Sequence, residues 1–233
     1  MTIHNSQHPN LGQVTLLRTR RGRDRSGRFV AEGEDLIAAA AANGWQPVDS
    51  FVAEGSGLSG TEVSEEALAE VSALGSGTRA LAIYEQRWGE PAGPLAVWLH
   101  GVGDPGNVGT IIRSAHAFGA SSVILGPGSA DPFGPKAVRA SMGAIFSVSV
   151  ARLDKINELP GATVALAASA PLQLDGAPWP DGELTLMIGA EREGLPQAAL
   201  DAADEVRSIE IAGDSLNAAM AATIALYSCT RKL

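Results

Sequence analysis

Apolar runs of strand length alternate with helical segments from residue 95 to the end of the sequence. The runs predict strands at Leu95–Leu99, Ser122–Leu125, Ile145–Val150, Thr163–Ala168, Leu184–Ile188 and Val206–Ile211. The segments between them predict helices at Val108–Phe118, Lys136–Met142, Asp154–Leu159, Pro196–Ala203 and Ser215–Arg231. Because short apolar strands separated by helices favour parallel pairing, we expect an α/β fold with a mainly parallel sheet flanked by helices on both faces.

A smaller α/β pattern precedes this one. It consists of a helix that follows the acidic residues 32–35 and ends near Gly44, a helix from Ser64 to Leu74, and strands at Val48–Val52 and Ala80–Tyr84. The next residues are rich in Pro and Gly, which is typical of a linker. The sequence therefore predicts a basic N-terminal arm over residues 1–28, a small α/β domain over 29–86, a linker over 87–94 and a larger domain over 95–233.

The composition indicates a globular protein of one large or two modest domains, since 45% of the 233 residues are hydrophobic. No apolar run reaches the roughly 18 residues that a membrane-spanning helix needs. The first ten residues lack the apolar core of a signal peptide. We therefore expect a cytoplasmic protein without a membrane segment. The one cysteine, Cys229, falls in the apolar pattern of the last helix, which favours a buried thiol.

The charge is distributed unevenly. The net charge of −9 argues weakly against a nucleic-acid partner, because phosphate binding normally requires a basic excess. The N-terminal arm is nevertheless strongly basic, with Arg18, Arg20, Arg21, Arg23, Arg25 and Arg28 against the single acid Asp24. This segment is compatible with a solvated surface and equally with an arm that contacts RNA.

The loop after the first strand of the larger domain contains candidate chemistry. Several glycines surround Asn107, so the backbone can approach a ligand closely, and the Asn107 amide both donates and accepts hydrogen bonds. Arg113 lies near the N-terminal end of the following helix, where the helix dipole favours anions over cations. A glycine-rich turn before a helix is weak support for a ligand site when it is taken alone.

Two later loops also follow predicted strands. Glu191 lies in the first of them, within the glycine-containing segment 189–196. In the second, Asp214 or Ser215 is placed to cap the last helix, with Asn217 in its first turn. Because ligands of parallel sheets bind at the carboxyl ends of strands, these loops predict a site, although each alone is also compatible with an ordinary turn or cap.

Taken together, the three loops resemble the motifs of the SpoU (TrmH) branch of the SPOUT RNA methyltransferases. The motifs occur in the family's order as Asn107-Val108-Gly109 with Arg113-Ser114, Gly189-Ala190-Glu191 with Gly194-Leu195, and Ser215-Leu216-Asn217 with Ala221. The resemblance covers about Leu95 to the C-terminus and includes Asp104-Pro105 and the segment 136–143. This sequence departs from the family where Glu210 replaces the usual proline and where the loop before the last motif is shorter.

The resemblance implies an enzyme that transfers a methyl group from S-adenosylmethionine to a ribose 2′-hydroxyl of RNA, with ribosomal RNA as the expected substrate. It also implies a deep trefoil knot near the C-terminus. Family members are homodimers through the knot region, with the partner subunit helping to form the RNA site. The segment that begins at Phe29 with FVAEG looks like the substrate-binding domain of several ribosomal-RNA members.

The family's catalytic roles carry over to five residues, which are Asn107, Arg113, Glu191, Ser215 and Asn217. Arg113 is expected to bind an RNA phosphate and to stabilise the developing alkoxide, because a guanidinium normally stays protonated; direct deprotonation of the hydroxyl is the alternative. Asn107 and Glu191 would orient Arg113 and the ribose, and Ser215 and Asn217 would complete the pocket. The implied cofactor-binding residues are Ala167, Ala168, Gly189, Ile209 and Leu216.

Several alternatives stay open. A tRNA ribose methyltransferase would share all these catalytic residues, and a non-catalytic RNA-binding member could keep the same fold. Without the motifs the pattern would suggest a dinucleotide-binding enzyme, but no GxGxxG follows the first strand. No metal site is expected, because His100 and His116 have no acid or cysteine partners at ligand spacing. Lys136 and Arg139 could contact RNA phosphates or simply form a solvated helix face.

Overall fold

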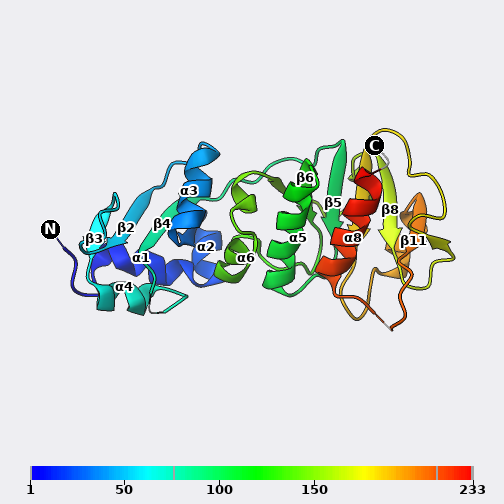
Figure 1. The fold of residues 1–233 in the computed structure, drawn as a ribbon. Helices are drawn as coiled ribbons and strands as arrows, with labels where there is room; N and C mark the ends of the chain where they lie inside the picture. Colours follow the sequence, from blue (N-terminus) through cyan, green and yellow to red (C-terminus); the bar gives the residue numbers. More distant parts are fainter. Residues whose placement is uncertain (1, 76, 214, 232–233) are drawn as a thin grey trace. The chain divides into compact units, whose positions relative to one another are not determined.

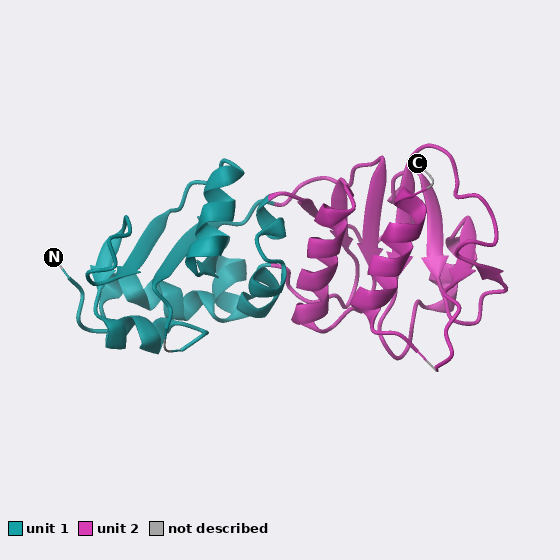
Figure 2. Cartoon of the chain, viewed as in Figure 1, with its two compact units in different colours: residues 1–87, 133–146 teal, residues 88–132, 147–233 magenta. Residues whose placement is uncertain are grey.

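The computed structural model describes residues 2–75, 77–213 and 215–231. The chain contains two compact units (Figure 2). Unit 1 comprises residues 1–87 and 133–146, and unit 2 comprises residues 88–132 and 147–233. An α/β architecture with two sheets is therefore confirmed, although the boundaries differ from the expected ones.

Unit 1 is built on a four-stranded mixed sheet in the order β1-β4-β2-β3. Its elements are β1 (Arg28–Glu32), β2 (Asp49–Ala53), β3 (Thr61–Val63), β4 (Ala80–Glu85), α1 (Pro9–Leu17), α2 (Arg20–Ser26), α3 (Glu34–Ala42), α4 (Glu65–Val71), α6 (Pro135–Ala140) and the 3₁₀ turn η1 (Ala144–Phe146). β4 pairs antiparallel with β1 and β2, whereas β2 and β3 are parallel. Because alternate residues of a strand point to opposite faces, Leu81 and Ile83 of β4 join an aliphatic core with α1 and α4, whereas Tyr84 joins an aromatic cluster.

The basic N-terminal segment, residues 1–28, differs from the expected arm because it forms two helices within unit 1. α1 buries Leu11, Val14 and Leu17 in the aliphatic core. α2 approaches the end of α1 closely: a Cβ at Gly22 would lie 2.1 Å from the Leu16 carbonyl oxygen. Arg23 is buried, and its guanidinium donates to the Leu17 carbonyl at 2.8 Å. The hydrophobic pattern gives no sign of α2 because its buried residues are a glycine and an arginine.

Residues 133–146, expected within the larger domain, also belong to unit 1. The rings of Phe133 and Phe146 lie 4.9 and 6.0 Å from that of Phe29 in β1, measured between centroids. The indole N–H of Trp45 donates to the Phe146 carbonyl at 2.9 Å. Aromatic burial therefore assigns this segment to unit 1, and the sequence periodicity of a short helix carries no information about which sheet it covers.

Unit 2 is built on a seven-stranded parallel sheet in the order β7-β6-β5-β10-β8-β11-β9. Its elements are β5 (Leu95–Leu99), α5 (Pro105–Ala117), β6 (Ser122–Leu125), β7 (Ser149–Arg152), the 3₁₀ turn η2 (Ile156–Glu158), β8 (Ala162–Leu166), β9 (Leu172–Gln173), β10 (Leu184–Ile188), α7 (Gln197–Ala202), β11 (Glu205–Ser208) and α8 (Ala218–Thr230). α5 and α8 lie side by side over the sheet (Figure 1). A second core joins Trp98 and Met187 of the strands to Ala199 of α7.

In unit 2, the predicted elements differ from the observed ones mainly at their ends. β5, β6 and β10 have the predicted bounds, whereas β7 begins at Ser149 because η1 takes up the preceding residues. The segment predicted as the helix Asp154–Leu159 contains only the short η2 turn. α8 begins at Ala218, three residues later than predicted, because the Asn217 side chain caps it.

The Pro- and Gly-rich residues 88–94 are packed against unit 2 and do not form a free linker. The Gly89 N–H donates to the Val150 carbonyl at 2.8 Å. Ala92 and Ser122 exchange two hydrogen bonds of 3.2 and 2.8 Å.

None of the helices in the described part of the chain is long and apolar enough to cross a membrane. The deep knot implied by the family resemblance stays a prediction.

Candidate functional site

The strand order brings two of the three polar loops together. β5 and β10 are neighbours in the middle of the sheet, with β6 beyond β5 on one side and β8 beyond β10 on the other. In parallel sheets, ligands bind outside the carboxyl ends of strands where the strand order reverses. The loops that leave β5 and β10 both lie at this position.

The first loop is fixed by the start of α5. Asp104 is the N-cap, and its carboxylate accepts a hydrogen bond from the Asn107 backbone N–H at 3.0 Å. Pro105 occupies the first turn, where a missing N–H costs nothing. The cap thus holds Asn107 in the first turn of α5, with its amide facing the other two motifs.

Three residues from the three motifs form one hydrogen-bond network. The Asn107 side-chain amide donates to Oε1 of Glu191. The Asn217 amide donates to Oδ1 of Asn107 at 3.1 Å and to the same Glu191 oxygen at 3.3 Å. Asn107 and Asn217 are 110 positions apart in the sequence, so the fold alone assembles this network.

Asn217 is also the N-cap of α8. Its side-chain Oδ1 accepts from the backbone N–H groups of Ala219 and Met220 at 2.9 and 3.3 Å, so one side chain both caps the helix and donates to the network. The expected cap at Ser215 is therefore wrong, and Asp214 lies outside the described residues.

Further along the two helices, the hydroxyls of Ser114 in α5 and Thr223 in α8 lie 2.7 Å apart. The two helices thus run in the same direction from the network.

A cavity of about 390 Å³ lies beside this network. It is lined by all five residues that the family resemblance assigns to the cofactor, namely Ala167, Ala168, Gly189, Ile209 and Leu216. Glu191 and Ser215 also line it. Glu191 is therefore shared by the cavity and the network.

The wall of the cavity after β10 requires glycine. The N–H groups of Ala190 and Gly194 donate to each other's carbonyls at 3.1 and 2.9 Å, which folds the segment back on itself. A Cβ at Gly189 would lie 2.2 Å from the Gly194 carbonyl carbon and 2.3 Å from the Leu195 nitrogen. Because both are backbone atoms, no side-chain movement can relieve such a contact.

Arg207 of β11 is a buried structural residue that the motif analysis did not identify. Its side chain is fully buried. The guanidinium donates to the carboxylate of Glu205 and to three backbone carbonyls of the segment after β9, those of Leu174, Ala177 and Pro178. It also lies 4.4 Å from the centre of the Trp179 ring. The Arg207 carbonyl accepts from the Ala167 N–H at 3.0 Å, which links β11 to the cavity wall.

Arg113 is separate from the network. It is exposed on α5 and, within the described part of the chain, its side chain makes no hydrogen bond or ion pair. On a helix of 3.6 residues per turn, Asn107 and Ser114 lie on the flank that faces α8, and Arg113 projects about 100–120° away from them. The expectation that Asn107 and Glu191 orient Arg113 directly therefore has no counterpart in the observed contacts.

The cavity suits the cofactor implied by the family resemblance. Its volume lies within the range of roughly 300–1,000 Å³ found for small-molecule sites. Apolar side chains such as Leu166, Ile188 and Leu195 suit an adenosine, and the Glu191 carboxylate suits a cationic sulfonium. Over the described residues, no group of three or more His, Cys, Asp or Glu side chains could hold a metal ion.

Comparison with known families matches both parts of the chain. Residues 94–227 match the SpoU rRNA Methylase family, and residues 8–82 match the MRM3-like substrate binding domain. The second match begins within the N-terminal segment, in agreement with the position of α1 in unit 1.

Individual relatives resemble the chain over its length. The 23S rRNA (guanosine(2553)-2′-O)-methyltransferase RlmP of Bacillus subtilis (strain 168) is 31% identical over 97% of both chains. The AdoMet-bound rRNA methyltransferase from Sinorhizobium meliloti superposes with a TM-score of 0.88 at 29% identity, covering 100% of this chain and 98% of that one. The SpoU methyltransferase AviRb from Streptomyces viridochromogenes, in complex with AdoMet, gives a TM-score of 0.84 at 28% identity over 97% and 98% of the two chains.

Proposed function

This chain belongs to the SpoU rRNA methylase family and is an S-adenosylmethionine-dependent RNA 2′-O-methyltransferase, and we propose that it methylates a ribose of ribosomal RNA at the Asn107–Glu191–Asn217 network. The observation that carries this proposal is the convergence of the three motifs beside a cavity of cofactor size. A ribosomal RNA substrate would place the protein in the cytoplasm.

The cavity residues would bind and orient the cofactor. S-adenosylmethionine supplies an activated methyl group on a positively charged sulfur. Ala167, Ala168, Gly189, Ile209 and Leu216 would hold it, mainly through backbone groups and apolar contacts. Because a displacement at a methyl group needs the attacking oxygen in line with the leaving sulfur, rigid backbone loops suit this task better than flexible side chains.

The network would hold the ribose. Asn107 and Asn217 both donate to Oε1 of Glu191, and no described residue donates to Oε2. Oε2 is therefore available to accept a hydrogen bond from a ribose hydroxyl, which would aim the 2′-oxygen at the cavity. Ser215, which lines the cavity, would complete this end of the site.

Arg113 would act from the RNA side. As a permanently charged and exposed guanidinium, it can bind a phosphate next to the methylated nucleotide and stabilise the negative charge that develops on the 2′-oxygen. Its separation from Asn107 and Glu191 favours a role in binding RNA over a role in which those residues activate it.

We also propose that the protein acts as a homodimer. Met220, Ile224 and Tyr227 of α8 are 61%, 39% and 48% exposed and are spaced so that they share one helix face. An exposed apolar stripe of this kind is typical of a surface that another protein covers. A second copy of the chain is the partner that family membership favours.

The roles of the site residues can be tested by separating catalysis from cofactor binding. We expect Arg113→Ala and Asn217→Ala to reduce methyl transfer to ribosomal RNA by about 10²-fold or more, the effect of removing one transition-state donor. Calorimetric affinity for S-adenosylmethionine should change by less than about threefold in Arg113→Ala, because Arg113 does not line the cavity. His116→Ala, an exposed change on the same helix, serves as the control. Wild-type turnover in Arg113→Ala would remove that residue from the catalytic set.

A further inference from the structure

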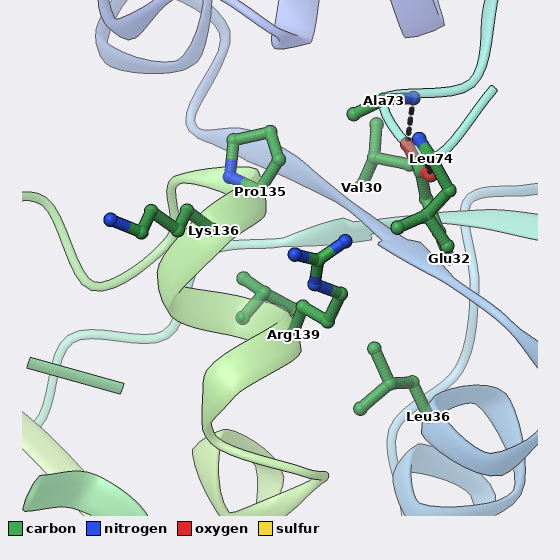
Figure 3. A pocket seen from close by; sticks show the side chains of 9 residues that line it. Val30, Glu32, Leu36, Ala73, Leu74, Pro135, Lys136 and Arg139 are labelled. Carbon is green, nitrogen blue, oxygen red and sulfur yellow. Dashed lines mark hydrogen bonds between the residues drawn. The ribbon is translucent and has the colours of Figure 1, made fainter. Parts of the chain in front are cut away.

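Unit 1 contains a second cavity, of about 190 Å³, that none of the roles described so far uses (Figure 3). It lies between α6, β1, α3 and the segment that follows α4. The lining residues are Val30, Glu32, Leu36, Ala73, Leu74, Pro135, Lys136, Val138 and Arg139. Both apolar and charged side chains therefore contribute to its walls.

The carboxylate of Glu32 in this cavity already accepts hydrogen bonds from the protein. Oε1 of Glu32 accepts from the Ala73 N–H at 2.8 Å, and Oε2 accepts from the Ser72 hydroxyl at 2.9 Å and the Leu74 N–H at 3.2 Å. The Ser72 hydroxyl also lies 2.8 Å from that of Thr78. Glu32 thus fixes the segment 72–74 as a rigid wall, and most of its hydrogen-bonding capacity is used within the protein.

The arginine in this cavity has unused donors. Arg139 is exposed at the surface of α6, and its guanidinium points between α6 and the Glu32–Leu74 wall (Figure 3). Over the described residues the Arg139 side chain makes no hydrogen bond or ion pair. A guanidinium presents five N–H donors in a planar fork that matches a phosphate. Lys136 lies one helical turn earlier, so its charge adds to the same rim.

The remaining walls are apolar. Val30, Leu36 and Val138 are buried side chains at the base of the cavity, and Leu74 is 41% exposed at its edge. An apolar cavity of roughly 150 Å³ can hold a benzene molecule. A cavity of about 190 Å³ is therefore large enough for one six-membered ring, with the guanidinium at its mouth.

We propose that this cavity binds one nucleotide of the RNA substrate, with the base against Leu74 and the aliphatic walls and the adjoining phosphate on Arg139. A flat ring joined to an anion matches both halves of the site, and single-stranded RNA can turn a base out to fill such a pocket. The match of residues 8–82 to a substrate binding domain favours RNA over an acidic peptide. The proposal rests on the proposed function in so far as that function makes RNA the substrate.

Two variants of the full chain separate the two halves of the site. Arg139→Gln removes the phosphate donor, and Leu74→Ala removes the exposed apolar edge. Arg79→Gln is the matched charge control, because Arg79 is an exposed arginine of unit 1 paired with Glu34 at 2.9 Å. Leu16→Ala is the matched apolar control, since Leu16 is 51% exposed in the same unit.

The measurement is the dissociation constant for in vitro transcribed ribosomal RNA over a series of salt concentrations. We expect Arg139→Gln to weaken binding about tenfold and to lower the slope of log K against log salt by about 0.7–0.9, the effect of one lost phosphate contact. Leu74→Ala should weaken binding about threefold or more without changing the slope, because it removes no charge. Both controls should bind within twofold of wild type.

The outcomes distinguish this proposal from the proposed function. Wild-type binding with an unchanged slope in Arg139→Gln would overturn the phosphate contact, and equal affinities of Leu74→Ala and Leu16→Ala would overturn the base contact. Thermal unfolding of each variant shows whether unit 1 stays folded. If Arg139→Gln is unfolded, the folded variant Arg139→Lys, which keeps the charge, should show the wild-type slope of log K against log salt. A wild-type protein that binds RNA but transfers no methyl group would contradict the proposed function and leave this cavity assignment intact.

Discussion

At position 189, the chain requires a residue without a side chain. Any Cβ there would overlap the backbone of Gly194 and Leu195, which closes the wall of the proposed cofactor cavity. The sequence shows only a glycine after an apolar strand, whereas the structure shows that the hydrogen-bonded return of residues 190–194 imposes it.

We therefore expect Gly189→Ala to weaken S-adenosylmethionine binding at least tenfold, because the loop must open to make room for the Cβ of the alanine. A tenfold loss corresponds to about 1.4 kcal/mol. Gly213→Ala is the matched control, since a Cβ at Gly213 meets no atom within 4 Å. Isothermal titration calorimetry measures both. Equal affinities for the two variants would show that the wall tolerates a side chain.

The proposed catalytic residues illustrate what a sequence can and cannot reveal. The motif resemblance identified Asn107, Glu191 and Asn217 together, and the structure brings them into hydrogen-bond contact. Their roles remain proposals. Arg207 gave no signal, because a buried arginine in a strand is recognisable only once the carbonyls that surround it are known.

Among the elements, buried parallel strands were the most predictable. β5, β6 and β10 are continuous apolar runs between turns, and their bounds match the prediction. The ends of α8 and β7 were not predictable from periodicity, because a side-chain cap at Asn217 and a 3₁₀ turn set them. α1 and α2 were missed because α1 has only a short stripe, Leu11, Val14 and Leu17, which packs in the core of unit 1, and α2 has no apolar stripe and is held by the buried Arg23.

One carboxylate joins β8 to β11 and makes this part of the sheet sensitive to acid. Asp204 accepts hydrogen bonds from the Thr163 N–H and hydroxyl, both at 2.8 Å. These two bonds, with the backbone one first, lower the pKa of Asp204 below its ordinary value of 3.8. Because the folded protein favours the charged form, the carboxylate stabilises it at pH values above the unfolded pKa of about 3.9.

We expect Asp204→Asn to lower the free energy of unfolding at pH 7, and the difference from wild type to shrink as the pH falls through the lowered folded-state pKa of Asp204. Urea unfolding at a series of pH values measures this difference. Asp201→Asn is a useful comparison, because Asp201 lies on the neighbouring α7 and, among the described residues, its side chain pairs only with Gln197. A difference that stays constant down to pH 2.5 would contradict the charge-based account.

For the whole molecule, family membership and the exposed stripe on α8 favour a dimer. We expect the wild-type protein to sediment as a dimer at micromolar concentrations. Ile224→Glu should shift it to monomer, because a charge at the centre of an apolar interface loses its hydration. Leu16→Glu, an equally drastic change at an exposed leucine of unit 1, should leave the dimer intact. A monomeric wild-type protein would contradict this interface.

The division into two units also shows a limit of reading the chain in order. Residues 133–146 lie between β6 and β7 of the larger sheet in sequence, yet they supply α6 and two aromatic side chains to unit 1. As a result, the cavity that we assign to an RNA nucleotide combines residues from sequence positions about 100 apart, and local patterns could not reveal it.

The most direct test of the function is to follow a labelled methyl group. Purified protein would be incubated with S-adenosylmethionine labelled in the methyl group and with unmodified ribosomal RNA or tRNA, and the RNA would then be digested to nucleosides. We predict label in one 2′-O-methylnucleoside from ribosomal RNA, and its loss in the Asn217→Ala variant. Label in a nucleobase, label in tRNA alone, or no incorporation by the wild-type protein would contradict the account.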